Sequence, residues 1–204
     1  MGAMKLGVLI SGRGSNLLAI LDAVADGRLD AEIALVLSNR ADAPGLQRAA
    51  AAGIPNGTIP HGDFADRASF ETEVVRRLTA AGVDTIALAG FDRIVTSTLL
   101  DAFPGRILNI HPALLPSFTG LHGQRQALEY GCRIAGVTVH FVDEKLDHGP
   151  IIAQAAVPIE DDDTEETLAA RILSEEHRLY PAALQALARG DLRQVGRRVL
   201  GGPR

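Results

Sequence analysis

The sequence has few aromatic residues and almost no cysteine. It contains no Trp, aromatic residues make up 4% of it, and Cys132 is its single cysteine. One cysteine excludes an internal disulfide and suits a reducing compartment, so we expect a cytoplasmic protein. Because Trp is missing, Ala, Leu, Ile and Val must fill the core, and a hydrophobic fraction of 47% is enough for a sizeable one.

The chain also lacks an excess of positive charge and any long apolar run. Its formal net charge is −5, which argues against a nucleic-acid partner that needs a basic face. No apolar run reaches transmembrane length and the first residues do not form a signal peptide, so no membrane partner is expected. No metal site is predicted either, because the six histidines lack the close spacing of zinc ligands.

Strand and helix patterns alternate over the first half of the chain. Strands are expected at 5–10, 32–37, 57–59, 84–89 and 106–110, and helices near 16–26, 44–52, 67–81 and 96–102. This alternation predicts an α/β fold with a mostly parallel, twisted, Rossmann-like sheet and helices on both faces. A single domain over residues 1–204 is expected, with halves at 1–100 and 101–204.

The pattern changes after about residue 130. Two β-branched runs joined by a loop, at 133–142 and 151–157, predict an antiparallel addition to the sheet in the C-terminal half. A final helix is expected over about 164–188, with Asp163 and Glu166 as its capping pair. Pro181 is expected to kink this helix or to restart it after Tyr180.

A short apolar strand carries an Asn and a His immediately before a proline. Side chains alternate along a strand, so Asn109 and His111 share one face at the end of that strand. In a parallel α/β sheet, ligands bind at this end. Taken alone, the pattern fits a polar strand edge entering a turn as well as it fits a site.

A glycine turn, residues 11–16, connects the first strand to the first helix. The free N–H groups and the helix dipole of such a turn bind anions, and glycines let the backbone approach a ligand closely. The turn is not the dinucleotide fingerprint, because Leu17 stands where the third glycine would fall. It is either a phosphate site or an ordinary turn in which Ser15 or Asn16 caps the helix.

A third stretch opens from the strand that carries His140 into an acidic loop closed by Gly149 and Pro150. Asp147 precedes this flexible glycine, so the loop can present its carboxylate. A carboxylate beside an imidazole raises the imidazole pKa, and Asp147 would hold His111 as a cation if the two meet. A loop Asp considered alone is a turn former.

Five motifs occur in a fixed order along the chain: Gly12-x-Gly14-Ser15-Asn16, Ala89-Gly90-Phe91-x-Arg93-Ile94, Asn109-x-His111-Pro112, Leu146-Asp147-x-Gly149-Pro150 and Glu176-His177-x-x-Tyr180-Pro181. With them the chain resembles the 10-formyltetrahydrofolate-dependent formyltransferases from about residue 5 to residue 195. The resemblance is strongest to the members that act on glycinamide ribonucleotide in purine synthesis.

The resemblance implies transfer of a formyl group from 10-formyltetrahydrofolate to the amine of glycinamide ribonucleotide, by direct attack through a tetrahedral intermediate. It implies Asn109, His111 and Asp147 as the catalytic trio, with His140 in a supporting position. The Asn109 amide and a protonated His111 would bind the developing oxyanion. Asp147 would carry a proton from the amine to N10 of the folate.

The resemblance also implies substrate contacts. Ribonucleotide contacts are implied at Gly14, Ser15, Asn16 and Glu176. Folate contacts are implied at Arg67, Asp92, Arg93, Ile94, Val95, Asn109, Asp143, Glu144 and Asp147. Without the resemblance, Glu176 would be a solvent-facing helical acid and Arg67 a surface arginine, while Ile94 and Val95 would be core residues.

Three features depart from the pattern of the family. Asp92 stands where relatives often have an apolar residue such as Met, and His148 stands where a small residue is common. Residues 117–120 lack the Lys-Tyr/Phe-Pro run of many relatives. These changes affect the wall of the folate pocket and the lid loop, while the trio and the phosphate turn are intact.

Two further interpretations stay open. One is a sibling enzyme, either a formyltetrahydrofolate hydrolase, which carries an additional N-terminal domain, or a methionyl-tRNA formyltransferase, which carries an additional C-terminal one. Here the first expected strand starts at Lys5 and only about twenty residues follow the last expected helix. The other is a non-catalytic nucleotide-binding module, which does not need the trio to converge. A monomer or weak homodimer is expected.

Overall fold

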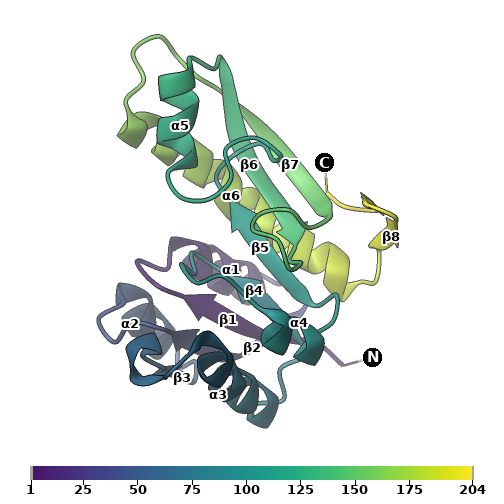
Figure 1. The fold of residues 1–204 in the computed structure, drawn as a ribbon. Coiled ribbons are helices and arrows are strands. Elements are labelled where there is room, and N and C mark those ends of the chain that lie inside the picture. Colours follow the sequence, from purple (N-terminus) through teal and green to yellow (C-terminus); the bar gives the residue numbers. More distant parts are fainter. Residues whose placement is uncertain (1, 204) are drawn as a thin grey trace. The chain divides into compact units, whose positions relative to one another are not determined.

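The computed structural model describes residues 2–203 as two compact units, which divide between Asn109 and Ile110. One strand, β5 (Ile107–His111), passes from the first unit into the second. Figure 1 shows the elements of both units in the order of the sequence. None of the helices among the described residues has the length and apolarity needed to cross a bilayer.

The first unit is a parallel sheet with the strand order β3-β2-β1-β4-β5. Its strands before β5 are β1 (Met4–Ile10), β2 (Ala31–Ser38), β3 (Asn56–Thr58) and β4 (Thr85–Leu88). Its helices are α1 (Ser15–Ala25), α2 (Pro44–Ala51), the single 3-10 turn η1 (His61–Asp63), α3 (Arg67–Ala80) and α4 (Ser97–Ala102).

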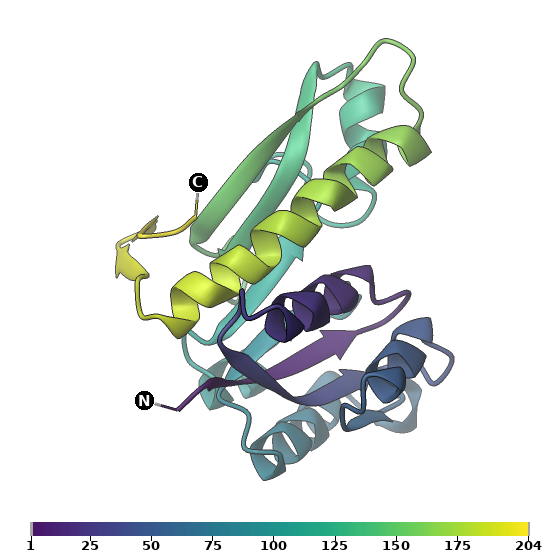
Figure 2. The same ribbon diagram turned by 180° about the vertical axis from the view of Figure 1, so that it is seen from behind.

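Helices cover both faces of this parallel sheet. In Figure 1, α3 and α4 lie in front of the strands, and in Figure 2, turned by half a circle, α1 and α2 lie in front. Strands β1 and β4 are therefore covered on both sides, and nearly all of their residues are buried. This explains why both strands are continuous apolar runs in the sequence rather than alternating ones.

The second unit is built on an antiparallel hairpin. Its strands are β6 (Ile134–Phe141), β7 (Ile151–Pro158), β8 (Arg193–Val195) and β9 (Arg198–Leu200), and its helices are α5 (Gly123–Tyr130) and α6 (Glu165–Ala188). Strand β7 pairs with β6 in antiparallel and with β9 in parallel, and β9 pairs with β8 in antiparallel. Helix α6 lies across one face of the β6–β7 hairpin and contacts α5 (Figure 2).

The predicted fold class is confirmed: a mostly parallel sheet with helices on both faces, and antiparallel strands in the C-terminal half. The predicted capping pair of the last helix was wrong, and so was a restart of the helix at Pro181. The helix is capped by Thr164 with Thr167, because Asp163 is turned to the Arg171 guanidinium at 2.8 Å. It also runs without a restart through Pro181, since α6 is continuous from Glu165 to Ala188.

The sequence patterns did not predict α5 or the C-terminal hairpin of β8 and β9. Both carry signals that are visible in retrospect. Gly131 ends α5 with φ 81°, a left-handed conformation that favours glycine. Gly196, with φ 59°, forms the turn between two three-residue strands that are too short to show a clear alternation.

A buried carboxylate connects α3 to the start of α4. The Glu71 side chain accepts hydrogen bonds from the Thr96 N–H at 2.8 Å, the Thr96 hydroxyl and the Leu99 N–H at 3.3 Å. Only 3% of Glu71 is exposed. The carboxylate satisfies donors in the first turn of α4 and lies at the positive end of its dipole.

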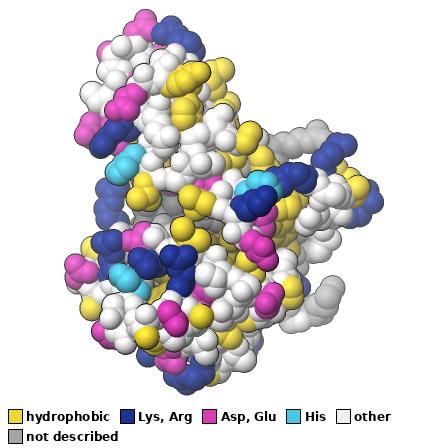
Figure 3. Space-filling view, viewed as in Figure 1, with side chains coloured by type: hydrophobic (Ala, Val, Ile, Leu, Met, Phe, Trp, Pro, Cys, Tyr) yellow, Lys and Arg dark blue, Asp and Glu magenta, His cyan; other side chains and the backbone are white. Residues whose placement is uncertain are grey.

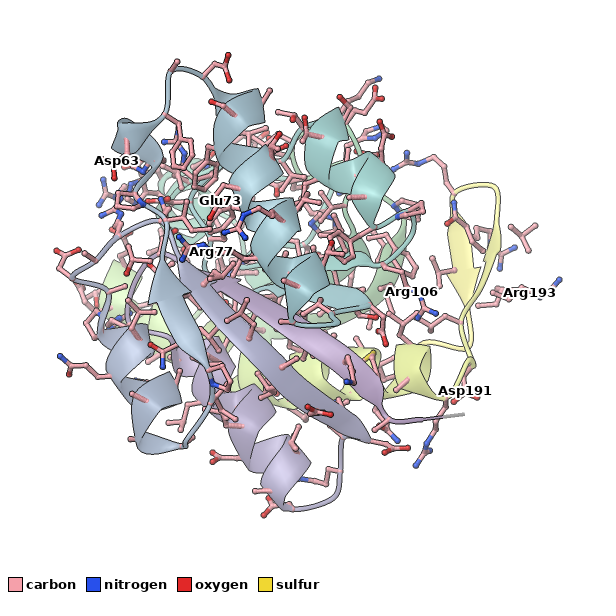
Figure 4. The ribbon with its side chains drawn as sticks, turned by 90° about the horizontal axis from the view of Figure 1, so that it is seen from below. Asp63, Glu73, Arg77, Arg106, Asp191 and Arg193 are labelled. Carbon is pink, nitrogen blue, oxygen red and sulfur yellow. The ribbon has the colours of Figure 1, made fainter. Side chains whose placement is uncertain are left out.

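We predict that Glu71→Ala lowers the free energy of unfolding by about 2–4 kcal/mol, because three buried donors lose their acceptor. Glu73→Ala is the matched control on the same helix, since Glu73 pairs with Arg77 at the surface, as Figure 4 shows. Its effect on urea-induced unfolding should be clearly smaller. Equal losses for the two variants would contradict the role of Glu71.

Candidate active site

His111 is the last residue of β5 and is only 4% exposed. Its Nε2 lies 2.8 Å from the carbonyl oxygen of Phe118. A carbonyl oxygen only accepts hydrogen bonds, so Nε2 carries a proton and donates it. The other ring nitrogen, Nδ1, faces Oδ2 of Asp147 at 3.5 Å.

Asp147 lies in the loop that follows β6, and its side chain is 6% exposed. Its Oδ2 accepts the Gly120 N–H at 2.7 Å, and its Oδ1 lies 3.9 Å from Nε2 of His140. The backbone of Asp147 adopts φ 49°, a left-handed conformation that Asp tolerates better than most residues. The loop thus turns sharply at the residue whose carboxylate points between two imidazoles.

His140 carries its proton on Nδ1, whereas His111 donates from Nε2. Its Nδ1–H donates to the carbonyl of Phe141 at 2.8 Å, and the residue is 2% exposed. Burial lowers the pKa of His140, and the bond to the Phe141 carbonyl, which raises it, does not outweigh that effect. A neutral His140 presents an Nε2 lone pair toward Asp147. His111 is therefore the ring that is suited to share a proton with this carboxylate.

A buried hydroxyl fixes the segment that follows His111. The Thr138 hydroxyl on β6 donates to the carbonyl of Ala113 at 2.7 Å and accepts the N–H of Leu115 at 3.0 Å. It also accepts from the Gln154 amide of β7 at 2.9 Å. These bonds hold the start of the 112–120 loop on the hairpin, and the same loop supplies the carbonyl and the N–H that meet the catalytic candidates.

The glycine turn in the first unit has the features of an anion site. Gly14 precedes α1 with φ 70°, and a Cβ at this position would lie 2.8 Å from the Cα of Gly45. No side chain caps α1, and its first turn carries no acid. Ser15 is half-buried and Asn16 is buried. Uncapped N–H groups at a helix start bind phosphate well.

Asp92 belongs to a polar network at the carboxyl ends of β1, β2 and β4. Its Oδ1 accepts the Asn39 amide at 2.9 Å, and its backbone N–H donates to the Ser11 hydroxyl, also at 2.9 Å. The Arg40 guanidinium pairs with Oδ2. Partial burial raises the pKa of Asp92, but the hydrogen bonds from Asn39, Ser11 and Arg40 together hold it below its usual value. In Figure 3, basic side chains and a histidine gather on the surface of this unit near α2.

The remaining predicted folate contacts have different surroundings. Arg67 is exposed in the first turn of α3, Arg93 is half-buried and Glu144 is exposed. Ile94 is 46% exposed, while Val95 is buried. The expectation that both would be core residues therefore holds for Val95 alone.

Three further predicted residues complete the set. Glu176 on α6 is 8% exposed, so it is not the solvent-facing acid that its sequence context favours. Asn109 precedes His111 by two residues on β5 and is half-buried. Asp143 pairs with His148 at 2.8 Å. Among the predicted residues, the structure brings together His111, Asp147 and His140: the Asp147 carboxylate lies 3.5 Å from the His111 ring and 3.9 Å from the His140 ring.

The sequence did not point to Phe118 or Gly120 as partners of His111 and Asp147. Both act through backbone atoms, which any residue type supplies. Phe118 has φ 52°, a conformation that its residue type does not predict. A glycine at 120, with φ 80°, was the one available hint of a turn that could expose an N–H group.

A parallel α/β sheet, an uncapped helix start after a glycine turn and a buried imidazole–carboxylate pair are features that many α/β enzymes combine. The chain belongs to the formyl transferase family, whose sequence model matches residues 4–184.

Named relatives support the same grouping. Phosphoribosylglycinamide formyltransferase of Escherichia coli (strain K12) is 43% identical over 190 residues, which cover 93% of this chain and 90% of that protein. Trifunctional purine biosynthetic protein adenosine-3 of Drosophila pseudoobscura pseudoobscura is 52% identical over 193 residues, or 94% of this chain, but this chain spans only 14% of that protein.

A solved structure shares the fold. Glycinamide ribonucleotide transformylase 1 from Symbiobacterium toebii superposes with a TM-score of 0.97 and 51% sequence identity, and the match covers 98% of this chain and 95% of that one.

We predict that the His140 ring titrates below the ordinary imidazole pKa of about 6.5, measured by NMR. The unfolded chain then binds this proton more readily than the native state does, so native stability falls as the pH drops below about 6.5. His140→Asn should reduce that loss between pH 7 and pH 5. A measured His140 pKa above the ordinary value would contradict the assignment.

Proposed function

We propose that this protein transfers the formyl group of 10-formyltetrahydrofolate to the amine of glycinamide ribonucleotide, as the names of its relatives suggest. The observation that carries the proposal is the buried pair of His111 and Asp147. We further propose a cytoplasmic enzyme that acts on these two small molecules as a monomer or weak homodimer.

The proposed reaction needs no covalent enzyme intermediate. The substrate amine attacks the formyl carbon, a tetrahedral oxyanion forms, and the bond from carbon to N10 breaks as N10 gains a proton. Asp147 accepts the proton that the amine loses and passes it on, directly or through a water molecule. The Asn109 amide and the His111 ring stabilise the oxyanion. In acyl transfer, such stabilisation of the oxyanion lowers the barrier more than proton transfer does.

The contact between His111 and Phe118 gives this proposal a concrete step. In the free protein the Nε2–H of His111 donates to the Phe118 carbonyl. In the reacting complex we propose that the formyl oxygen replaces this carbonyl as the acceptor. The 117–120 loop then has to move, which releases the Gly120 N–H from Asp147 as well. His140 stays neutral and supports Asp147 without competing for its proton.

Substrate binding is proposed from separate parts of the chain. Gly14, Ser15 and Asn16 hold the phosphate of the ribonucleotide, supported by the uncapped start of α1. Glu176 accepts hydrogen bonds from ribonucleotide hydroxyls. The proposed folate contacts are Arg67, Asp92, Arg93, Ile94, Val95, Asn109, Asp143, Glu144 and Asp147. Because Asp92 is already paired with Arg40, it would offer the folate a polar wall.

The function is tested by following release of tetrahydrofolate spectroscopically with and without glycinamide ribonucleotide. The proposal expects turnover that depends on the ribonucleotide and yields one formylated amine for each folate consumed. Folate turnover that ignores the amine would identify a hydrolase instead. Binding of the ribonucleotide with no turnover of the folate would identify a non-catalytic module.

We predict that His111→Ala lowers kcat by at least about 100-fold, because one oxyanion donor and the partner of Asp147 are lost together. The dissociation constant of glycinamide ribonucleotide, measured by calorimetry, should stay within about twofold, since phosphate binding uses other residues. His61→Ala, at an exposed histidine of η1, is the matched control and should keep its activity. Retained turnover in His111→Ala would refute the proposed role.

A further inference from the structure

A single arginine connects the C-terminal hairpin to the loop that carries Asp147. Arg197 lies in the turn between β8 and β9 and contacts His148, the residue that follows Asp147. Its Nη2 donates to the His148 carbonyl, and its Nη1 lies 3.2 Å from Nε2 of the His148 ring. One side chain thus holds both the backbone and the ring of its partner.

The ring of His148 extends this contact across the loop. Nη1 of Arg197 lies 3.4 Å from Nδ1 of His148 as well. A carboxylate only accepts, so Nδ1 carries the proton toward Asp143 and Nε2 accepts from the guanidinium. Nδ1 lies 2.8 Å from Oδ2 of Asp143, and Oδ1 of Asp143 accepts the Lys145 N–H at 3.0 Å. A chain of hydrogen bonds therefore runs from Arg197 through the His148 ring to Asp143, at the other end of the loop.

The hairpin is anchored well enough to act as a support. Arg198 on β9 pairs in parallel with Ile151 of β7, directly after the loop. Gly202 packs so closely that a Cβ there would lie 2.2 Å from the Ile152 carbonyl oxygen. Figure 3 shows a histidine beside basic and acidic side chains on the surface of this unit, near the C-terminal hairpin.

The loop between these supports leaves Asp147 little freedom. Asp147 itself is in the left-handed conformation, with φ 49°. At Gly149 the chain passes so close to the Phe141 carbonyl that a Cβ would lie 1.8 Å from its oxygen. His148, between the two, is half exposed, with 43% of its side chain accessible. Arg197 and Asp143 therefore hold the exposed part of this turn, and of these two Arg197 is the contact that comes from outside the loop.

We propose that Arg197 is a positioning residue, which acts through His148 to hold the Asp147 carboxylate in place for proton transfer. This proposal rests on the proposed function, in which Asp147 moves the proton. It also gives His148 a role, because the ring that departs from the small residue common in the family is the group that Arg197 and Asp143 share. The C-terminal hairpin is then part of the catalytic apparatus.

The test compares Arg197→Ala, Arg197→Lys and the control Arg193→Ala in the full chain. Arg193 lies on the same hairpin, is exposed, and points away from it in Figure 4. Two readouts are taken: amide hydrogen exchange of peptides that cover residues 142–150, and steady-state kinetics of formyl transfer over a range of pH values. Melting temperatures report whether the fold is intact.

In Arg197→Ala we expect exchange in the 142–150 peptides to rise at least about tenfold, since the loop loses its outer support. We expect kcat to fall about 10- to 100-fold because the carboxylate is misplaced, with the KM for glycinamide ribonucleotide within about twofold of the parent. The pH dependence of kcat should also differ from that of the parent, because proton transfer through a misplaced carboxylate is less efficient. Lysine keeps a positively charged donor group but not the planar fork of the guanidinium, so Arg197→Lys should be intermediate.

The outcomes separate the contact, the positioning role and the function. Unchanged hydrogen exchange of the 142–150 peptides in Arg197→Ala would show that Arg197 does not support this loop, and would overturn the proposal. Faster exchange with unchanged kcat and an unchanged pH profile overturns the positioning role. If Arg193→Ala changes the hydrogen exchange and kcat as much as Arg197→Ala does, the cause is general destabilisation of the hairpin, and the proposal is overturned too. If formyl transfer is the wrong function, the parent protein shows none, while the exchange difference between Arg197→Ala and Arg193→Ala persists.

Discussion

Asp147 is a carboxylate whose side chain is 94% buried, and an ionised carboxylate in such surroundings is stable only if its charge is met by donors. The structure supplies an N–H group from Gly120 and an imidazole from His111. Two features of the second unit bring these groups to the carboxylate. The 112–120 loop is tied to the hairpin so that its N–H group reaches the carboxylate, and β5 ends where its last residue faces it.

Two histidines lie near the same carboxylate and differ through their hydrogen bonds. His140 donates Nδ1–H to a backbone carbonyl and stays neutral, because burial lowers its pKa. His111 donates Nε2–H and turns its other nitrogen to Asp147. A shared carboxylate with two inequivalent imidazoles is a way to keep one proton in a defined place while another moves.

The alternation of strands and helices was enough to predict the parallel sheet, because β1 and β4 are apolar apart from Lys5 and Thr85 and do not alternate as half-exposed strands do. It did not decide the roles of His111 and Asp147, because the same patterns fit a polar strand edge and a turn-forming Asp, and only the resemblance to the formyltransferases implied that the two residues act together. What could not be predicted lies in the backbone. The Phe118 carbonyl and the Gly120 N–H depend on left-handed φ values that follow from tertiary packing.

Short elements and exposed charges were equally hard to predict. Helix α5 has eight residues and β8 and β9 have three each, so periodicity carries little signal in them. Nothing near Arg197 in the sequence distinguishes it from Arg193 or Arg198. The capping of α6 was misplaced by one residue because Asp163 and Thr164 are both good caps, and the ion pair with Arg171 decided between them.

The most direct test of the central claim is a single-turnover measurement of formyl transfer in Asp147→Asn. Asparagine keeps the size of the side chain and an oxygen that can accept the Gly120 N–H, but it loses the charge and the ability to take a proton. We predict a fall in the chemical rate of at least about 1,000-fold with ribonucleotide binding preserved. A variant that transfers the formyl group at the parental rate would contradict it.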